Sequence, residues 1–95
     1  MTMNYVDGMV DPTPNPNAVK FTLDRAVTEG GSESYANKEQ AQANPLAAKL
    51  FELPGVAAVF MLNNFITITR DPEYGWDALA SEVVNVIQAH FEGGA

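Results

Sequence analysis

The segment that decides the fold is the run DPTPNPN at residues 11–17, followed at once by AVKFTL at residues 18–23. Its prolines hold φ at about −65° and remove backbone N–H donors, so residues 11–17 form neither a helix nor a central strand. In residues 18–23 apolar and polar side chains alternate, which is typical of a strand with one covered and one solvated face. We therefore expect a stiff loop that leads into a strand, with Val19, Phe21 and Leu23 facing the core.

Two helices are predicted farther along the chain. Asn44 is a favourable N-cap and Pro45 a favourable first helical residue, so a helix begins there, and Pro54-Gly55 ends it. Residues 76–91 carry apolar side chains at three- and four-residue spacing, which indicates a second helix with one face toward the core. Residues 38–43 are polar and alanine-rich, and they form either a helical turn or a loop.

Three further segments have the pattern of strands. The apolar run at residues 56–61 predicts a strand that is covered on much of both faces. The alternating run at residues 65–70 follows it after Asn63-Asn64, two residues that tolerate the positive φ of a tight hairpin turn. A short strand is expected within residues 32–36.

This order of elements predicts an α+β fold, with a small antiparallel β-sheet and two α-helices packed on one face. A chain of 95 residues is long enough for one domain with its own core. We assign residues 11–95 to that single domain. Residues 1–10 form either an edge strand or a flexible tail.

The opposite face of the sheet is expected to stay uncovered. By the alternation of the strands, Lys20 and Thr22 share that face with Phe65, Thr67 and Thr69. Threonines beside an aromatic ring and a lysine form a hydrogen-bonding and moderately apolar surface that suits a protein partner. The alternative is an ordinary solvated sheet face with one exposed phenylalanine.

Asn15 and Asn17, in the proline-rich segment, allow two interpretations. Together with the ammonium of Lys20 they could recognise the backbone or a carboxylate of a partner, which makes them candidate partner-binding residues. Their amides could equally close the turns of the loop itself. Both interpretations hold together if one asparagine shapes the loop and the other is presented to a partner.

The composition excludes several classes of function. The sequence contains no cysteine, which removes disulfides, thiol catalysis and cysteine-ligated metal sites. With 12 acidic and 5 basic residues the net charge is −7, so phosphate backbones and anionic membranes are repelled. No segment has the pattern of a signal peptide or a membrane span. We expect a cytoplasmic monomer that binds neither nucleic acid nor membranes.

No set of catalytic residues is visible. His90 is the only histidine, and its place near the end of the last helix suits packing rather than proton transfer. Nothing marks a serine as a nucleophile, and the acidic groups within residues 29–33 and 71–77 lack the ligand spacing of a calcium loop. We therefore predict no catalytic residue, no metal ligand and no cofactor.

Several blocks of the sequence, in this order, match those of a known family. They are TPNPNAVKF at residues 13–21, NPLAAKLF at 44–51, LPGV at 53–56, FITIT at 65–69 and, more weakly, WDAL at 76–79. Together they resemble the N-terminal domain of Nfu/NifU-type iron–sulfur scaffold proteins, over nearly the whole chain.

The resemblance implies a role in iron–sulfur cluster assembly. In proteins of this type the cluster ligands lie in a separate C-terminal domain with a Cys-x-x-Cys motif, and this cysteine-free chain resembles the N-terminal module alone. We expect a non-enzymatic accessory or docking module that binds scaffold, carrier or client proteins and does not itself ligate a cluster. Two alternatives stay open: a general protein- or peptide-binding adaptor unrelated to clusters, and a small metal-binding protein.

Overall fold

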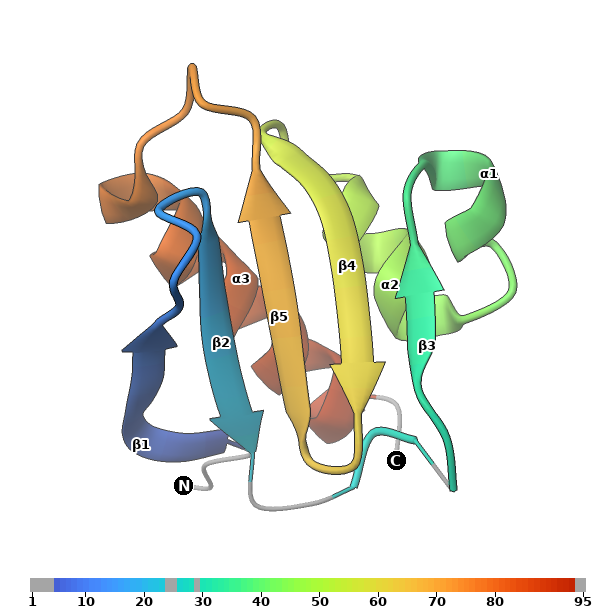
Figure 1. Cartoon of the computed structure of the whole chain (residues 1–95). Coiled ribbons are helices and arrows are strands. Elements are labelled where there is room, and N and C mark those ends of the chain that lie inside the picture. Colours follow the sequence, from blue (N-terminus) through green and yellow to red (C-terminus); the bar gives the residue numbers. More distant parts are fainter. Residues whose placement is uncertain (1–4, 24–25, 29, 94–95) are drawn as a thin grey trace.

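The computed structural model describes residues 5–23, 26–28 and 30–93, which form a sheet of five strands with three helices (Figure 1). The strands are β1 (Tyr5–Pro12), β2 (Ala18–Leu23), β3 (Glu33–Tyr35), β4 (Val56–Leu62) and β5 (Phe65–Arg70). The helices are α1 (Lys38–Ala41), α2 (Pro45–Phe51) and α3 (Trp76–Gly93). The predicted α+β class is confirmed, and residues 38–41, expected as a helical turn or a loop, form the short helix α1.

The sheet has the strand order β1-β2-β5-β4-β3, and all neighbouring strands are antiparallel. β4 and β5 form the predicted hairpin, and Asn63 in its turn has a φ of 55°. The carbonyl of Asn63 accepts hydrogen bonds from the N–H groups of Val27 (2.6 Å) and Thr28 (3.3 Å). The Asn63 N–H donates to Thr28 Oγ1 over 2.9 Å. The segment after β2 therefore holds the hairpin turn in place.

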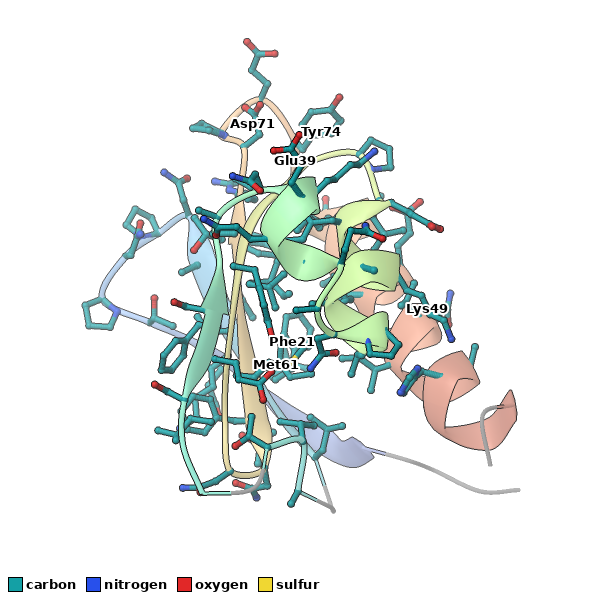
Figure 2. All side chains as sticks on the ribbon, turned by 90° about the vertical axis from the view of Figure 1, so that its right-hand side faces the viewer. Phe21, Glu39, Lys49, Met61, Asp71 and Tyr74 are labelled. Carbon is teal, nitrogen blue, oxygen red and sulfur yellow. The ribbon has the colours of Figure 1, made fainter. Side chains whose placement is uncertain are left out.

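The helices lie on one side of the sheet, and the core fills the space between the two layers (Figure 1). Figure 2 shows the sheet edge-on, with the labelled Phe21 and Met61 side chains between the strands and the helices. Both side chains are fully buried. The other buried residues of this core are Leu23, Val59, Ile66 and Ile68 from the sheet, Ala41, Leu46, Ala47, Leu50 and Phe51 from α1 and α2, and Leu79, Val83 and Ile87 from α3.

β2 follows the predicted alternation from Lys20 to Leu23, because Phe21 and Leu23 are buried while Lys20 and Thr22 are partly exposed. At its start Val19 is only partly buried, although it packs against the core, and Ala18 is buried. In the last helix Leu79, Val83 and Ile87 are the residues that face the core, as their spacing predicted.

β1 spans the predicted boundary between residues 1–10 and the domain of residues 11–95. β1 runs from Tyr5 to Pro12 and pairs with β2 at the edge of the sheet, with Val10 opposite Phe21 and a shift of register before it. The division of the chain at residue 10 stays a prediction. Among the described residues, no helix has the length and apolar character needed to cross a bilayer.

Candidate functional site: the open sheet face and the proline loop

The structure brings five of the predicted site residues together on the side of the sheet that the helices leave uncovered, here called the open face. In the pairing of β2 with β5, Lys20 lies opposite Thr67 and Thr22 lies opposite Phe65. Thr69 lies opposite Ala18 on the same face, one pair farther along the strands. All five predicted residues are partly exposed. Their role in binding a partner stays a prediction.

Two apolar side chains extend this face, and the sequence interpretation missed them. Phe60 of β4 lies opposite Thr67, and Leu62 lies opposite Phe65. The rings of Phe60 and Phe65 have centroids 6.1 Å apart and are tilted by 43°, within the range of an attractive aromatic pair. Phe60 and Leu62 are both partly exposed, and the helices pack on the other side of this strand (Figure 1). Alternation around Val59 is the signal that could have found them.

Lys20 lies over one ring of the aromatic pair. Its Nζ lies 4.4 Å from the centroid of the Phe65 ring, a distance at which the ammonium is attracted to the ring face. In the pairing of β1 with β2, Asp11 lies opposite Lys20. An acidic residue therefore borders the open face at its β1 edge. The open face therefore combines an aromatic centre, a positioned cation and neighbouring hydroxyl groups.

The proline loop, residues 12–17, is shaped by its own side chains. Thr13 Oγ1 accepts a hydrogen bond from the Asn15 N–H over 3.1 Å, and lies 2.9 Å from the Asn15 carbonyl and 3.1 Å from the Ala18 carbonyl. Asn15 Oδ1 accepts from the Asn17 N–H over 2.9 Å, the contact of an Asx turn. The Ala18 N–H returns a bond of 3.0 Å to the Asn15 carbonyl. Asn15 is thus engaged in closing the loop.

Asn17 joins this loop to the segment between β5 and α3. Its carbonyl accepts from the Arg70 N–H over 2.7 Å, and its Oδ1 accepts from Arg70 Nε over 3.2 Å. Arg70 Nη1 donates to the Tyr74 carbonyl over 2.8 Å, and the guanidinium carbon lies 5.6 Å from the centre of the Trp76 ring. Trp76 Nε1 donates to the Pro16 carbonyl over 3.3 Å. The side-chain oxygens of both asparagines are therefore used within the chain, and recognition of a partner by either one stays a prediction.

Glu33, at the start of β3, accepts two hydrogen bonds from within the domain. Glu33 Oε1 accepts from the Tyr35 hydroxyl over 2.6 Å and from Asn44 Nδ2 over 3.0 Å. These two hydrogen bonds lower the pKa of Glu33, and burial together with the carboxylate raises the pKa of Tyr35. In the part of the chain that the structure describes, no three His, Asp or Glu side chains lie close enough to hold a metal ion. Glu29 lies outside the described residues.

His90 lies on the helical side of the molecule, away from the open face. Lys49 Nζ lies 3.2 Å from His90 Nδ1, so the ring nitrogen accepts from the ammonium when the imidazole is neutral. Burial, and then the charge of Lys49, lower the pKa of His90. The prediction that His90 packs at the end of the last helix agrees with this position in α3.

Comparison with known protein families gives a match over nearly the whole chain. Residues 9–94 match the family model described as scaffold protein Nfu/NifU N terminal. The chain is 33% identical over 82 residues to NifU-like protein 5, mitochondrial, of Arabidopsis thaliana, which covers 86% of this chain and 30% of that protein. It is 32% identical over 93 residues to the human NFU1 iron-sulfur cluster scaffold homolog, mitochondrial, which covers 97% of this chain and 37% of that protein. The chain thus spans about a third of the length of these relatives.

Two solved structures have the same fold. The solution structure of a NifU-like protein from Saccharomyces cerevisiae superposes with a TM-score of 0.76 at 23% identity, over 99% of this chain and 90% of that one. The crystal structure of protein SAV1430 from Staphylococcus aureus superposes with a TM-score of 0.72 at 23% identity, over 81% of this chain and 92% of that one. At this identity the likeness concerns the arrangement of the strands and helices.

The relatives contradict the cytoplasmic location that the sequence interpretation predicted. The Arabidopsis and human proteins are both named as mitochondrial. The prediction rested on the acidic composition and on the lack of an apolar leader pattern. These features describe a folded domain in water, which is the solvent of either compartment, so they carry no information on location.

Proposed function

Because this chain belongs to the family of Nfu/NifU scaffold-protein N-terminal domains, we propose that it acts in iron–sulfur cluster assembly as a docking module. It binds another protein of the assembly pathway, has no catalytic step of its own and leaves cluster ligation to its partner. The absence of cysteine from the sequence supports this division of labour, because iron–sulfur clusters are held mainly by cysteine thiolates.

The observation that carries the proposal is the aromatic centre of the open face. Phe60 and Phe65 are partly exposed side by side, and Lys20 lies over the second ring. Burial of the exposed part of such a ring contributes on the order of 1 kcal/mol, and a desolvated cation–π contact contributes a similar amount. A partner that covers both rings and the lysine therefore gains about 2–3 kcal/mol from this centre. Contacts elsewhere on the interface supply the rest, because association itself costs several kcal/mol.

The proline loop supports binding by being ordered before a partner arrives. Asn15, Asn17 and Arg70 hold its backbone through hydrogen bonds at both ends. A loop that is already fixed loses little conformational entropy on association, which leaves more of the contact energy for affinity. The loop borders the open face beside Ala18, so one partner can contact the loop and the β2–β5 surface together.

The proposal is tested by capture of partners with the full chain and with the variant Lys20→Glu/Phe65→Ser. Both side chains are partly exposed, but Phe65 contacts Phe60 and Lys20, so the variant should lose about 1–2 kcal/mol of stability and should stay folded at the temperature of the assay. The unchanged chain should recover iron–sulfur assembly proteins from a lysate of its source organism, identified by mass spectrometry, and the variant should recover none. Lys38→Glu, which makes the same charge change on the exposed surface of α1, is the matched control.

Two results would overturn the proposal. Equal recovery by the double variant would show that the open face is not the contact surface. Recovery of proteins with no part in cluster assembly, lost in the same variant, would instead make the chain a general adaptor that uses this face.

A further inference from the structure

A second surface lies on the helical side of the molecule, remote from the open face. The end of α2 and the last turns of α3 enclose a groove of about 480 Å³, here called the α2–α3 groove. Its lining residues are Lys49, Glu52, Leu53, Val86, Ala89 and His90. Figure 2 shows Lys49 on the outer side of the helical layer, with the helices between it and the sheet.

The centre of the groove is apolar. Leu53 and Val86 pack with one side against the core and are partly exposed on the other, and Ala89 is exposed. Leu53 lies just after α2, and Val86 and Ala89 belong to α3, so the groove exists only because the end of α2 is packed against α3. Covering them with apolar side chains of another molecule would remove apolar surface from water, which is favourable.

The rim of the groove carries charges of opposite sign at defined places. Lys49 and Glu52 are three positions apart at the end of α2, a spacing that places them on the same side of the helix. Lys49 Nζ lies 3.2 Å from His90 Nδ1, so this contact connects the two helices at the Lys49 end of the groove. The local surface is positive there and negative at Glu52, although the whole chain is acidic.

The shape of the groove favours a helix over a small molecule. Small-ligand pockets enclose roughly 70–90% of their ligand, whereas this groove is open along its solvent side. Amphipathic helices are recognised in grooves of this kind through apolar side chains that recur at three- and four-residue spacing. Charges of opposite sign on the rim suit a bound segment with the complementary order of charges, which fixes its direction.

We propose that the α2–α3 groove binds an amphipathic helix of a partner protein, with apolar side chains over Leu53, Val86 and Ala89, an acidic side chain at Lys49 and a basic side chain at Glu52. The site is separate from the open face, and neither proposal depends on the other. A single partner can therefore contact both surfaces, or two partners can bind at once.

The probe for this proposal is a pair of alanine-based peptides with blocked termini, each about 16 residues long so that it forms a helix. Both carry leucines at i, i+4 and i+7. One has glutamate and lysine in the proposed order on its flank, and the other has the two charges exchanged. With the full chain, the first peptide should shift the backbone amide signals of Leu53, Val86 and Ala89 in a saturable way. It should also shift the ring-proton signals of His90, because His90 lines the groove and is the only histidine in the sequence.

Variants of the rim separate a charge-directed contact from simple apolar adhesion. Lys49→Glu should lower the affinity for the first peptide by about fivefold, because an attraction becomes a repulsion. The same variant should bind the exchanged peptide more tightly than the first. Ala89→Glu, on an exposed position, should remove the binding of both peptides while the far-ultraviolet circular dichroism stays unchanged. Lys38→Glu on α1 is the control and should change neither affinity.

Each of the remaining outcomes would overturn the proposal. Amide shifts confined to the β2–β5 face, or no shifts at millimolar peptide, would show that the groove takes no helix. Saturation of the same signals by sodium octanoate, with displacement of the peptide, would assign the groove to small carboxylic acids. If the same amide signals shift with protein concentration in the absence of peptide, a second copy of this chain occupies the groove.

Discussion

Replacement of Asn44 by alanine should lower stability through two separate losses, because this one side chain joins α2 to β3. Asn44 Oδ1 accepts from the N–H groups of Leu46 (2.9 Å) and Ala47 (3.1 Å), which caps α2. Asn44 Nδ2 donates to Glu33 Oε1 over 3.0 Å. The change to alanine removes both sets of hydrogen bonds, whereas Asn44→Ser keeps a capping oxygen and removes only the donor to Glu33.

The magnitudes follow from these contacts. Loss of an N-cap costs about 1 kcal/mol. Loss of a hydrogen bond to a partly exposed carboxylate costs about another 1 kcal/mol, at the low end for charged acceptors because water competes for them. Asn44→Ala should therefore lower the free energy of unfolding by about 2 kcal/mol at pH 7, and Asn44→Ser by about 1 kcal/mol. For a domain of this size, 2 kcal/mol corresponds to a fall in Tm of about 10 °C.

The two losses differ in their dependence on pH. The donors from Tyr35 and Asn44 hold the pKa of folded Glu33 below its ordinary value of 4.5. A lowered pKa in the folded state contributes stability above the ordinary value, and this contribution disappears as the pH falls through the folded pKa. In acid, Asn44→Ser should thus approach the unchanged chain, while Asn44→Ala keeps the capping loss of about 1 kcal/mol.

Urea unfolding at pH 7 and at a series of lower pH values, followed by circular dichroism, measures both terms, because the contribution of Glu33 is lost only below its folded pKa. Equal destabilisation by serine and alanine at pH 7 would refute the capping role of Asn44 Oδ1. A deficit of Asn44→Ala that stays the same in acid would refute the contribution of the amide–carboxylate contact. Loss of less than about 0.5 kcal/mol in both variants would refute the whole account of β3 and α2.

Three further predictions concern the core, a turn and the helical surface. Leu50→Ala should cost about 2–5 kcal/mol in urea unfolding, because Leu50 is fully buried in the core; a cost below about 1 kcal/mol would contradict tight packing there. Gly55→Ala should destabilise by about 1–3 kcal/mol, since Gly55 has a φ of +99° and a Cβ would lie 2.7 Å from Tyr74 Cγ. Tyr74→Ala in the same chain should recover only the steric part, and full recovery would show that φ carries no strain. Lys49→Gln should raise the pKa of His90 in a proton NMR titration, because removing the ammonium favours the imidazolium form; an unchanged pKa would leave burial as the only cause.

Local rules predicted the elements whose causes lie within a few residues. Asn44 and Pro45 start α2 as their capping preferences indicate. Asn63 takes the positive φ that the turn between β4 and β5 requires. The alternation in residues 18–23 assigned Phe21 and Leu23 to the core and Lys20 to the open face. The second function of Asn44, its bond to Glu33, involves residues 11 positions apart and has no local signature.

The features that sequence reasoning missed depend on what lies above a strand or beside a loop. The run that contains Phe60 is apolar enough for burial on both sides, but only its inward side is covered by helices. Trp76 packs against the core from the start of α3, and its indole nitrogen also donates to the Pro16 carbonyl, 60 residues earlier, which the spacing did not predict. The contact of Asn17 with Arg70 spans 53 residues. Such pairings follow from strand order, which periodicity does not encode.

The attachment of Asn17 to Arg70 sets the length of the proline loop. Surface loops commonly accept insertions and deletions, because nothing beyond their ends depends on their length. Here one residue added or removed between Thr13 and Asn17 would displace the asparagine from the guanidinium and separate Pro16 from the Trp76 indole. Natural variation and engineered insertions should therefore be tolerated poorly at this loop, so a tag or reporter inserted there would disturb the start of α3 as well.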